Sequence, residues 1–159
     1  MNITIRPPCL KDGAAITRLV KESQTLDVNS SYLYFLLSDH FSQTCAIAEV
    51  NNRAVGFVTA YRLPDNPDVL FVWQVAVDPA MRGQGLAMRL LQNLAARDWF
   101  DQIRKVQCTI SPSNQASNAL FFKWANSLGA ELQITDYLTT DHLGDGHEAE
   151  PLVSFSIHR

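Results

Sequence analysis

One nearly uninterrupted apolar segment that leads through a glycine-bearing turn into an amphipathic helix constrains this chain most. Residues 69–77 contain a single polar side chain, Gln74, which is typical of a central strand covered on both faces. After the turn 82–85, apolar side chains recur at helical spacing on one face: Ala87, Leu90, Leu91, Leu94 and Ala95. A buried strand followed directly by such a helix predicts an α/β fold, a central sheet flanked by helices.

The rest of the chain supplies further strands and helices around that unit. Alternating or apolar segments predict strands near residues 3–5, 44–50, 54–62, 106–111, 132–138 and 152–157. Apolar periodicity and capping residues predict helices near 12–22, 31–37 and 114–129. We expect a hairpin turn at Asn51-Asn52 and a polar loop over 139–150. We also expect a loop over 63–67, because its two prolines cannot continue a strand ladder.

Composition and length narrow the class of protein. With 159 residues, 47% of them hydrophobic, the chain predicts one globular domain spanning residues 1–159. A net charge of −3 gives no bulk attraction to nucleic acid or to anionic membranes. The chain shows no leader peptide and no membrane-spanning segment, so we expect a cytoplasmic protein. Three scattered cysteines and four histidines lack the spacings of a disulfide framework or a metal site, and we expect no metal.

The glycine-bearing turn favours a pyrophosphate ligand. Gly83 and Gly85 lack the Cβ that would block approach to backbone N–H groups, and the positive end of the following helix attracts anions. Arg82 adds charge at the rim. The spacing fits neither a P-loop nor a Rossmann fingerprint. A tight turn in which glycine serves only packing is the alternative.

Two segments carry a resemblance to a known family. Residues 77–87 resemble motif A, [QR]-x-x-G-x-[GA], and residues 114–121 resemble motif B of the GNAT N-acetyltransferase superfamily. The resemblance implies a central mixed sheet whose fourth and fifth strands splay apart around acetyl-CoA, the cosubstrate. It implies these cofactor-binding residues: Val75, Ala76, Val77, Arg82, Gly83, Gln84, Gly85, Leu86, Ala87, Asn114, Ser117 and Phe121.

Two positions depart from the superfamily pattern. Ala80 takes the place that is commonly Gln or Arg, so phosphate binding would depend on Arg82 and the backbone amides. Phe121 stands where many members carry a tyrosine that protonates the leaving thiolate, and a phenyl ring has no proton to donate. Thiolate would therefore leave as the anion or take its proton from another donor.

Five separated segments are similar to the L-2,4-diaminobutyrate acetyltransferases of ectoine biosynthesis. They fall in order along the chain at residues 26–32, 40–45, 70–77, 109–114 and 146–148. This resemblance implies acetyl transfer from acetyl-CoA to the γ-amine of diaminobutyrate, giving the N4-acetyl product. It also implies a homodimer that responds to osmotic stress.

Diaminobutyrate carries two ammonium groups and one carboxylate, so its pocket needs acidic and hydrogen-bonding side chains. Asp27 is a candidate clamp for an ammonium group, and Asn29 and Tyr32 are candidate hydrogen-bond partners. Trp73 is a candidate aromatic wall for the cationic substrate. Gln74, a buried amide that must be hydrogen-bonded, is either a substrate residue or the partner of a strand irregularity. For the others, capping, loop and core roles are the alternatives.

The candidate proton acceptors are Glu150 and His147, in the loop that precedes the last strand. We expect direct attack of the amine on the thioester without an acyl-enzyme, because no cysteine has an activating partner. A backbone amide near Val75 would polarise the carbonyl. Two other functions stay open: an acetyltransferase for another small amine or a protein N-terminus, and a CoA-binding domain without catalytic activity.

Overall fold

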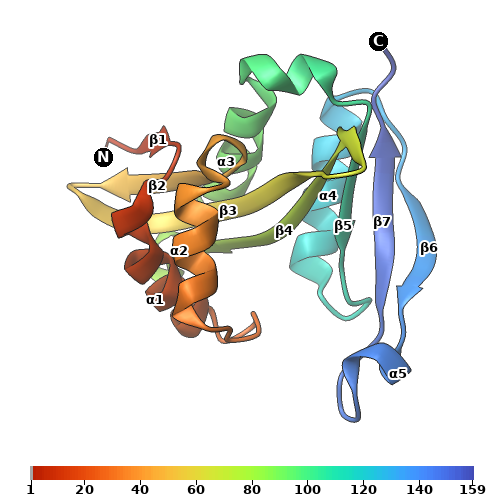
Figure 1. Ribbon diagram of the computed structural model, residues 1–159, viewed down its shortest axis with the longest axis horizontal. Coiled ribbons are helices and arrows are strands. Elements are labelled where there is room, and N and C mark those ends of the chain that lie inside the picture. Colours follow the sequence, from red (N-terminus) through yellow and green to blue (C-terminus); the bar gives the residue numbers. More distant parts are fainter. Residues whose placement is uncertain (1) are drawn as a thin grey trace. The chain divides into compact units, whose positions relative to one another are not determined.

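The computed structural model describes residues 2–159, and the chain divides into two compact units (Figure 1). The first unit extends to Tyr61 and includes Val72–Asp101. The second comprises Arg62–Phe71 and Gln102–Arg159, so two long strands, Arg53–Leu63 and Asn66–Val77, contribute residues to both units. The single domain expected from chain length stays a prediction.

Seven strands form the mixed sheet that the sequence predicts. They are β1 (Thr4–Arg6), β2 (Ala46–Val50), β3 (Arg53–Leu63), β4 (Asn66–Val77), β5 (Lys105–Thr109), β6 (Gln133–Leu138) and β7 (Glu150–Ser156). Their hydrogen-bonded order is β1-β2-β3-β4-β5-β7-β6. Strands β4 and β5 pair in parallel, with register from Val69–Lys105 to Phe71–Gln107. The β1–β2, β2–β3, β5–β7 and β6–β7 pairs are antiparallel. The divergence of β4 and β5 beyond their paired residues stays a prediction.

Over residues 2–159, five α-helices accompany the strands. They are α1 (Gly13–Ser23), α2 (Ser31–Asp39), α3 (Leu86–Ala95), α4 (Gln115–Ser127) and the short α5 (Thr140–Leu143). Short 3-10 turns lie at Leu10–Asp12, Ser42–Thr44, Pro79–Met81 and Asp98–Gln102. Across residues 2–159, no helix has both the length and the apolar character needed to cross a membrane.

In the first unit, α1 and α2 pack on one face of the strands and α3 on the other (Figure 1). Phe57 of β3 belongs to the buried cluster formed with α1 and α2. At the neighbouring Gly56, a Cβ would lie 3.3 Å from side-chain atoms of Leu86 and Leu90 in α3. Because successive strand residues face opposite sides, the two contacts identify the two covered faces. Glycine at position 56 therefore lets α3 pack closely on the sheet.

In the second unit, α4 packs its aromatic side chains against β7. Trp124 is fully buried, and its ring meets Phe155 edge-on at a centroid distance of 5.5 Å. Phe121, one turn earlier, meets Trp124 edge-on at 5.9 Å. Such edge-to-face pairs are a favourable arrangement for packed aromatic rings. Phe121, which stands where many family members carry a proton-donating tyrosine, is thus part of this aromatic core.

Two local expectations are wrong. The expected loop over 63–67 is a two-residue turn, Pro64-Asp65, and β4 already begins at Asn66. Proline is tolerated at Pro67 because it lies at the start of the strand, where its missing N–H costs little; its carbonyl accepts a hydrogen bond from Arg62 Nε at 2.5 Å. The expected polar loop over 139–150 contains the short helix α5, which Thr139 caps.

A charged cluster ties β1 to the start of α1. Arg6 donates to Asp12 at 2.8 Å and to Glu49 of β2 at 2.7 Å, and the Cys9 amide donates to Asp12 Oδ2 at 2.7 Å. Burial alone would raise the pKa of Asp12, but these donors outweigh it and hold that pKa below its ordinary value. The Asp12 carboxylate therefore stabilises the fold in its ionised form.

The three cysteines are free thiols in different environments. Cys9 is exposed, whereas Cys45 and Cys108 are buried. Burial raises the pKa of Cys45 to about 11 and also raises that of Cys108, because a thiolate is disfavoured away from water. Neither buried thiol is therefore suited to act as a nucleophile at neutral pH.

Candidate functional site

The turn before α3 is built to present backbone amides. Gly83 and Gly85 have φ angles of +79° and +74°, which side-chain-bearing residues rarely adopt. Gly85 is the N-cap of α3 and, having no side chain, leaves the amides of the first helical turn uncapped. A Cβ at either glycine would meet no protein atom within 4 Å. The glycines therefore serve backbone conformation and open access, as an anion site at a helix N-terminus requires.

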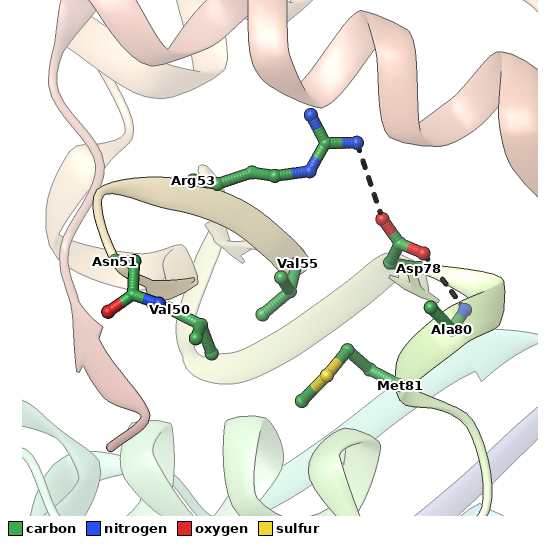
Figure 2. A pocket seen from close by; sticks show the side chains of 7 residues that line it. All are labelled: Val50, Asn51, Arg53, Val55, Asp78, Ala80 and Met81. Carbon is green, nitrogen blue, oxygen red and sulfur yellow. Dashed lines mark hydrogen bonds and ion pairs between the residues drawn. The ribbon is translucent and has the colours of Figure 1, made fainter. Parts of the chain in front are cut away.

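Asp78 braces the segment between β4 and this turn. Its amide donates to the Val55 carbonyl of β3 at 2.8 Å, and its carboxylate accepts from the Ala80 amide at 2.9 Å. Its other oxygen lies 3.7 Å from Arg53 and 4.0 Å from Arg18. Both Arg53 and Asp78 line a pocket of about 370 Å³, and Figure 2 shows the Arg53 guanidinium directed at the Asp78 carboxylate. The pocket is lined by Val50, Asn51, Arg53, Val55, Asp78, Ala80 and Met81.

The structure corrects how motif A is read. Since α3 begins at Leu86 with Gly85 as its cap, the helix-capping glycine is the second of the pair. Read from Arg82, the segment Arg82-Gly83-Gln84-Gly85-Leu86-Ala87 satisfies [QR]-x-x-G-x-[GA] in full. Ala80 is therefore no departure from the pattern. The Arg82 guanidinium reaches the Ser23 carbonyl, at the C-terminal end of α1, over 3.5 Å.

Strand β4 has a local irregularity at Gln74. The Gln74 amide donates to Thr59 Oγ1 at 3.2 Å, and that hydroxyl lies 3.4 Å from the Gln74 carbonyl. The Thr59 hydroxyl of β3 thus bonds the Gln74 backbone groups, which would otherwise pair with backbone groups of a neighbouring strand. Trp73 and Ala76, three residues apart, both contact the cluster formed with α1 and α2, although strict alternation would place them on opposite faces. These contacts fit an extra residue in the strand at this point.

Tyr34 of α2 meets β4 at the same place. It is fully buried, its ring stacks on Trp73 at 6.1 Å with an interplanar angle of 16°, and its hydroxyl donates to Gln74 Oε1 at 2.9 Å. Burial raises the pKa of Tyr34, the nearby charge of Asp27 raises it further, and the hydrogen bonds with Asn29 and Gln74 lower it by less. The phenol therefore stays protonated and able to donate. The sequence pattern did not point to this residue as part of the site.

The segment between α1 and α2 carries the expected substrate residues. Asp27 is exposed. Asn29 Nδ2 donates to the Asp27 carbonyl at 3.2 Å and to Tyr34 Oη at 3.4 Å. Tyr32 lies on the first turn of α2 with 69% of its surface exposed, and Ser30 caps that helix. Asp27, Asn29, Trp73 and Gln74 are thus linked through Tyr34, whereas Tyr32 points to solvent.

The predicted residues Asn114, Ser117 and Phe121 lie in the second unit. Asn114 caps α4 by accepting from the Ser117 amide at 3.1 Å, as one of the two expected capping residues. Asn118 Nδ2 donates to the Ser111 and Asn114 carbonyls at 3.2 and 2.9 Å. These bonds hold the turn that precedes α4 in a fixed conformation. A cofactor role for Asn114 and Ser117 stays a prediction.

Glu150 and His147 face each other at the start of β7. Thr109 of β5 donates to Glu150 Oε1 at 2.9 Å, and Glu150 Oε2 lies 3.7 Å from His147 Nε2. His147 Nδ1 lies 2.7 Å from the Glu148 carbonyl, which can only accept a hydrogen bond. Nδ1 therefore carries a proton, and Nε2 is the atom of the ring that gains or loses one. The pair offers two adjacent proton acceptors.

Known proteins share both the sequence and the fold. A model of the acetyltransferase (GNAT) family matches residues 14–124. An L-2,4-diaminobutyric acid acetyltransferase from Halalkalibacterium halodurans is 46% identical over 150 residues, 94% of this chain and 79% of that protein. The enzyme of the same name from Marinococcus halophilus is 44% identical over 151 residues, 95% of this chain and 87% of that protein.

A solved structure agrees with these relatives. The diaminobutyrate acetyltransferase EctA from Paenibacillus lautus, in complex with L-2,4-diaminobutyric acid and coenzyme A, matches with a TM-score of 0.94 and 39% identity. The match covers 98% of this chain and 95% of that one.

Proposed function

Because this chain belongs to the acetyltransferase (GNAT) family, we propose that it transfers the acetyl group of acetyl-CoA to the γ-amine of L-2,4-diaminobutyrate. The product is N4-acetyl-L-2,4-diaminobutyrate, an intermediate for ectoine biosynthesis. The observation that carries the proposal is the match over 98% of the chain to a structure in complex with diaminobutyric acid and coenzyme A.

On the cofactor side, the uncapped amides at the start of α3 suit the diphosphate of acetyl-CoA. Arg82 supplies a positive charge at the rim of that turn. The backbone of Val75, Ala76 and Val77 offers the polar groups of a strand to the pantetheine amides, in the manner of an added strand. A backbone amide near Val75 polarises the thioester carbonyl where negative charge develops.

On the amine side, Asp27 holds the α-ammonium group, and Asn29 and Tyr32 supply hydrogen bonds. Trp73, fixed by its stack on Tyr34, presents an aromatic face to the cationic substrate. Fixing the α-ammonium and the carboxylate in this way leaves the γ-amine free to reach the thioester. Regioselectivity then follows from position alone.

The reaction is a direct transfer. The neutral γ-amine attacks the carbonyl carbon, the C–N bond forms, the C–S bond breaks, and coenzyme A leaves as thiolate. An aliphatic amine has a pKa of about 10.4, so its deprotonation near pH 7.4 costs about 4 kcal/mol, less when a second ammonium group is close. Glu150 or His147 Nε2 accepts that proton, and the attacking nitrogen loses its second proton to solvent as the tetrahedral intermediate collapses to the amide. Phe121 cannot protonate the thiolate, so the leaving group departs as the anion or takes a proton from another donor.

The cellular setting stays a prediction from the sequence. We expect a cytoplasmic homodimer that acts in ectoine biosynthesis under osmotic stress, without nucleic acid, membrane or metal. A substrate panel tests the proposed activity: coenzyme A release is measured with diaminobutyrate, ornithine, lysine and a peptide N-terminus. We expect the highest kcat/KM with diaminobutyrate. Higher kcat/KM with the peptide or with another amine, or coenzyme A binding without turnover, would overturn it.

A further inference from the structure

A continuous chain of three hydrogen bonds leads from the backbone of Asp27 to the side chain of Gln74. The Asp27 carbonyl accepts from Asn29 Nδ2 at 3.2 Å, and the same amide donates to Tyr34 Oη at 3.4 Å. Tyr34 Oη then donates to Gln74 Oε1 at 2.9 Å. Residues far apart in the sequence, in the 24–30 segment and in β4, are thereby held at one separation.

The end of this hydrogen-bond series that lies in β4 is fixed by further contacts. Both backbone polar groups of Gln74 are bonded to Thr59 of β3, and the ring of Trp73 stacks on the ring of Tyr34. Gln74 is buried, so the hydroxyl of Tyr34 supplies a hydrogen bond that its Oε1 cannot gain from bulk water. The Tyr34 side chain therefore has one strongly preferred position, with its ring on Trp73 and its hydroxyl bonded to Gln74.

The other end, in the 24–30 segment, is held by contacts near the end of α1 as well. Besides the bonds of Asn29, the amides of Thr25 and Leu26 contact the Ser23 hydroxyl at 3.4 and 3.2 Å, at the end of α1. Asp27 itself is exposed. Leu26 also packs against the cluster formed with α1 and α2, and the bonds of Asn29 and Tyr34 add a direct hydrogen-bonded link from the Asp27 backbone to β4.

We propose that Tyr34 is a positioning residue that sets the length of the diamine which the enzyme accepts. This inference rests on the proposed function, in which Asp27 holds the α-ammonium and the thioester lies along β4. The hydrogen-bonded chain fixes the span between those two points, and the distal amine must match that span to attack. Ornithine is one methylene longer than diaminobutyrate, a difference that a well-positioned site discriminates by roughly 10–200-fold.

The test is Tyr34→Phe, which keeps the ring on Trp73 and removes the donor. We expect KM for diaminobutyrate to rise at least fivefold and the ratio of kcat/KM for diaminobutyrate over ornithine to fall at least fivefold. The Kd of coenzyme A should stay within twofold of wild type. Tyr137→Phe removes an exposed hydroxyl as a chemical control. Thr44→Val, which loses a part-buried hydrogen bond to the Ala60 carbonyl in the same unit, is the stability control.

An unchanged selectivity ratio in Tyr34→Phe, or an equal fall in Thr44→Val at the same Tm, would overturn the inference. If Tyr34→Phe does not fold, Asn29→Ala, which removes two of the three hydrogen bonds in the mostly exposed 24–30 segment, must lower the ratio, and an unchanged ratio overturns the inference equally. The wild-type enzyme in the same assay separates the two claims. No turnover of diaminobutyrate by wild type would refute the proposed function, whereas normal wild-type turnover with an unaltered variant ratio refutes only the role of Tyr34.

Discussion

Replacing Gly85 by alanine separates the two demands made on the turn before α3. The added methyl group meets no protein atom within 4 Å, so packing costs nothing. The φ angle of +74° does carry a cost, roughly 1–2 kcal/mol for a residue with a Cβ. For a chain of this size, that loss lowers Tm by about 2–8 °C. The same methyl group would occupy open space beside the turn to which we assign the diphosphate.

Gly129, just after α4, offers a matched control. Its φ is +70°, and a Cβ there also meets nothing within 4 Å. We therefore expect Gly85→Ala and Gly129→Ala to lose similar stability in thermal unfolding. In titration calorimetry with coenzyme A, Gly85→Ala should bind at least about tenfold more weakly, a difference of about 1.4 kcal/mol. Gly129→Ala should bind as wild type does. Equal coenzyme A affinity in the two variants would refute the assignment of the diphosphate to this turn.

Three further predictions concern other parts of the chain. Asp27→Ala and Glu150→Ala should each lower kcat/KM for diaminobutyrate at least tenfold while coenzyme A affinity stays near normal; unchanged kinetics in both would remove these assignments. Asp12→Asn should lower the free energy of unfolding at pH 7, because the pKa of Asp12 is depressed in the fold. In denaturant titrations across pH, that loss should shrink as the pH falls below the ordinary aspartate value of 3.8, and a loss that persists in strong acid would contradict the ion-pair account. A thiol reagent should modify Cys9 alone in the native protein and all three cysteines after denaturation; rapid native modification of Cys45 would contradict its burial.

Much of the architecture could be predicted from apolar patterning. The long apolar strand and the periodic helix after the glycines are a strand and a helix in the structure, as predicted. Both could be predicted because the pattern of apolar side chains alone decides which faces are buried. Pro67 shows the limit of a local rule: proline forbids one hydrogen bond, and the strand begins where that bond is not needed. Helix α5 carries no apolar stripe, so periodicity could not predict it; its signal was the capping residue Thr139.

The site was harder to predict than the fold. Residues 32–37 are almost all apolar or aromatic, so little polar contrast indicated that Tyr34, rather than Tyr32, faces the strands. Gln74 was visible as a polar residue in an apolar strand. Its partners Thr59 and Tyr34 come from β3 and α2, and only the tertiary fold brings them to it.

The central claim is that one particular nitrogen of one particular diamine receives the acetyl group. Mass spectrometry and NMR on the product formed from acetyl-CoA and L-2,4-diaminobutyrate measure this directly. We predict a single monoacetylated species with the acetyl group on N4 and stoichiometric release of coenzyme A. Acetylation at N2, a mixture of the two isomers, or no product from folded protein that binds coenzyme A would contradict it.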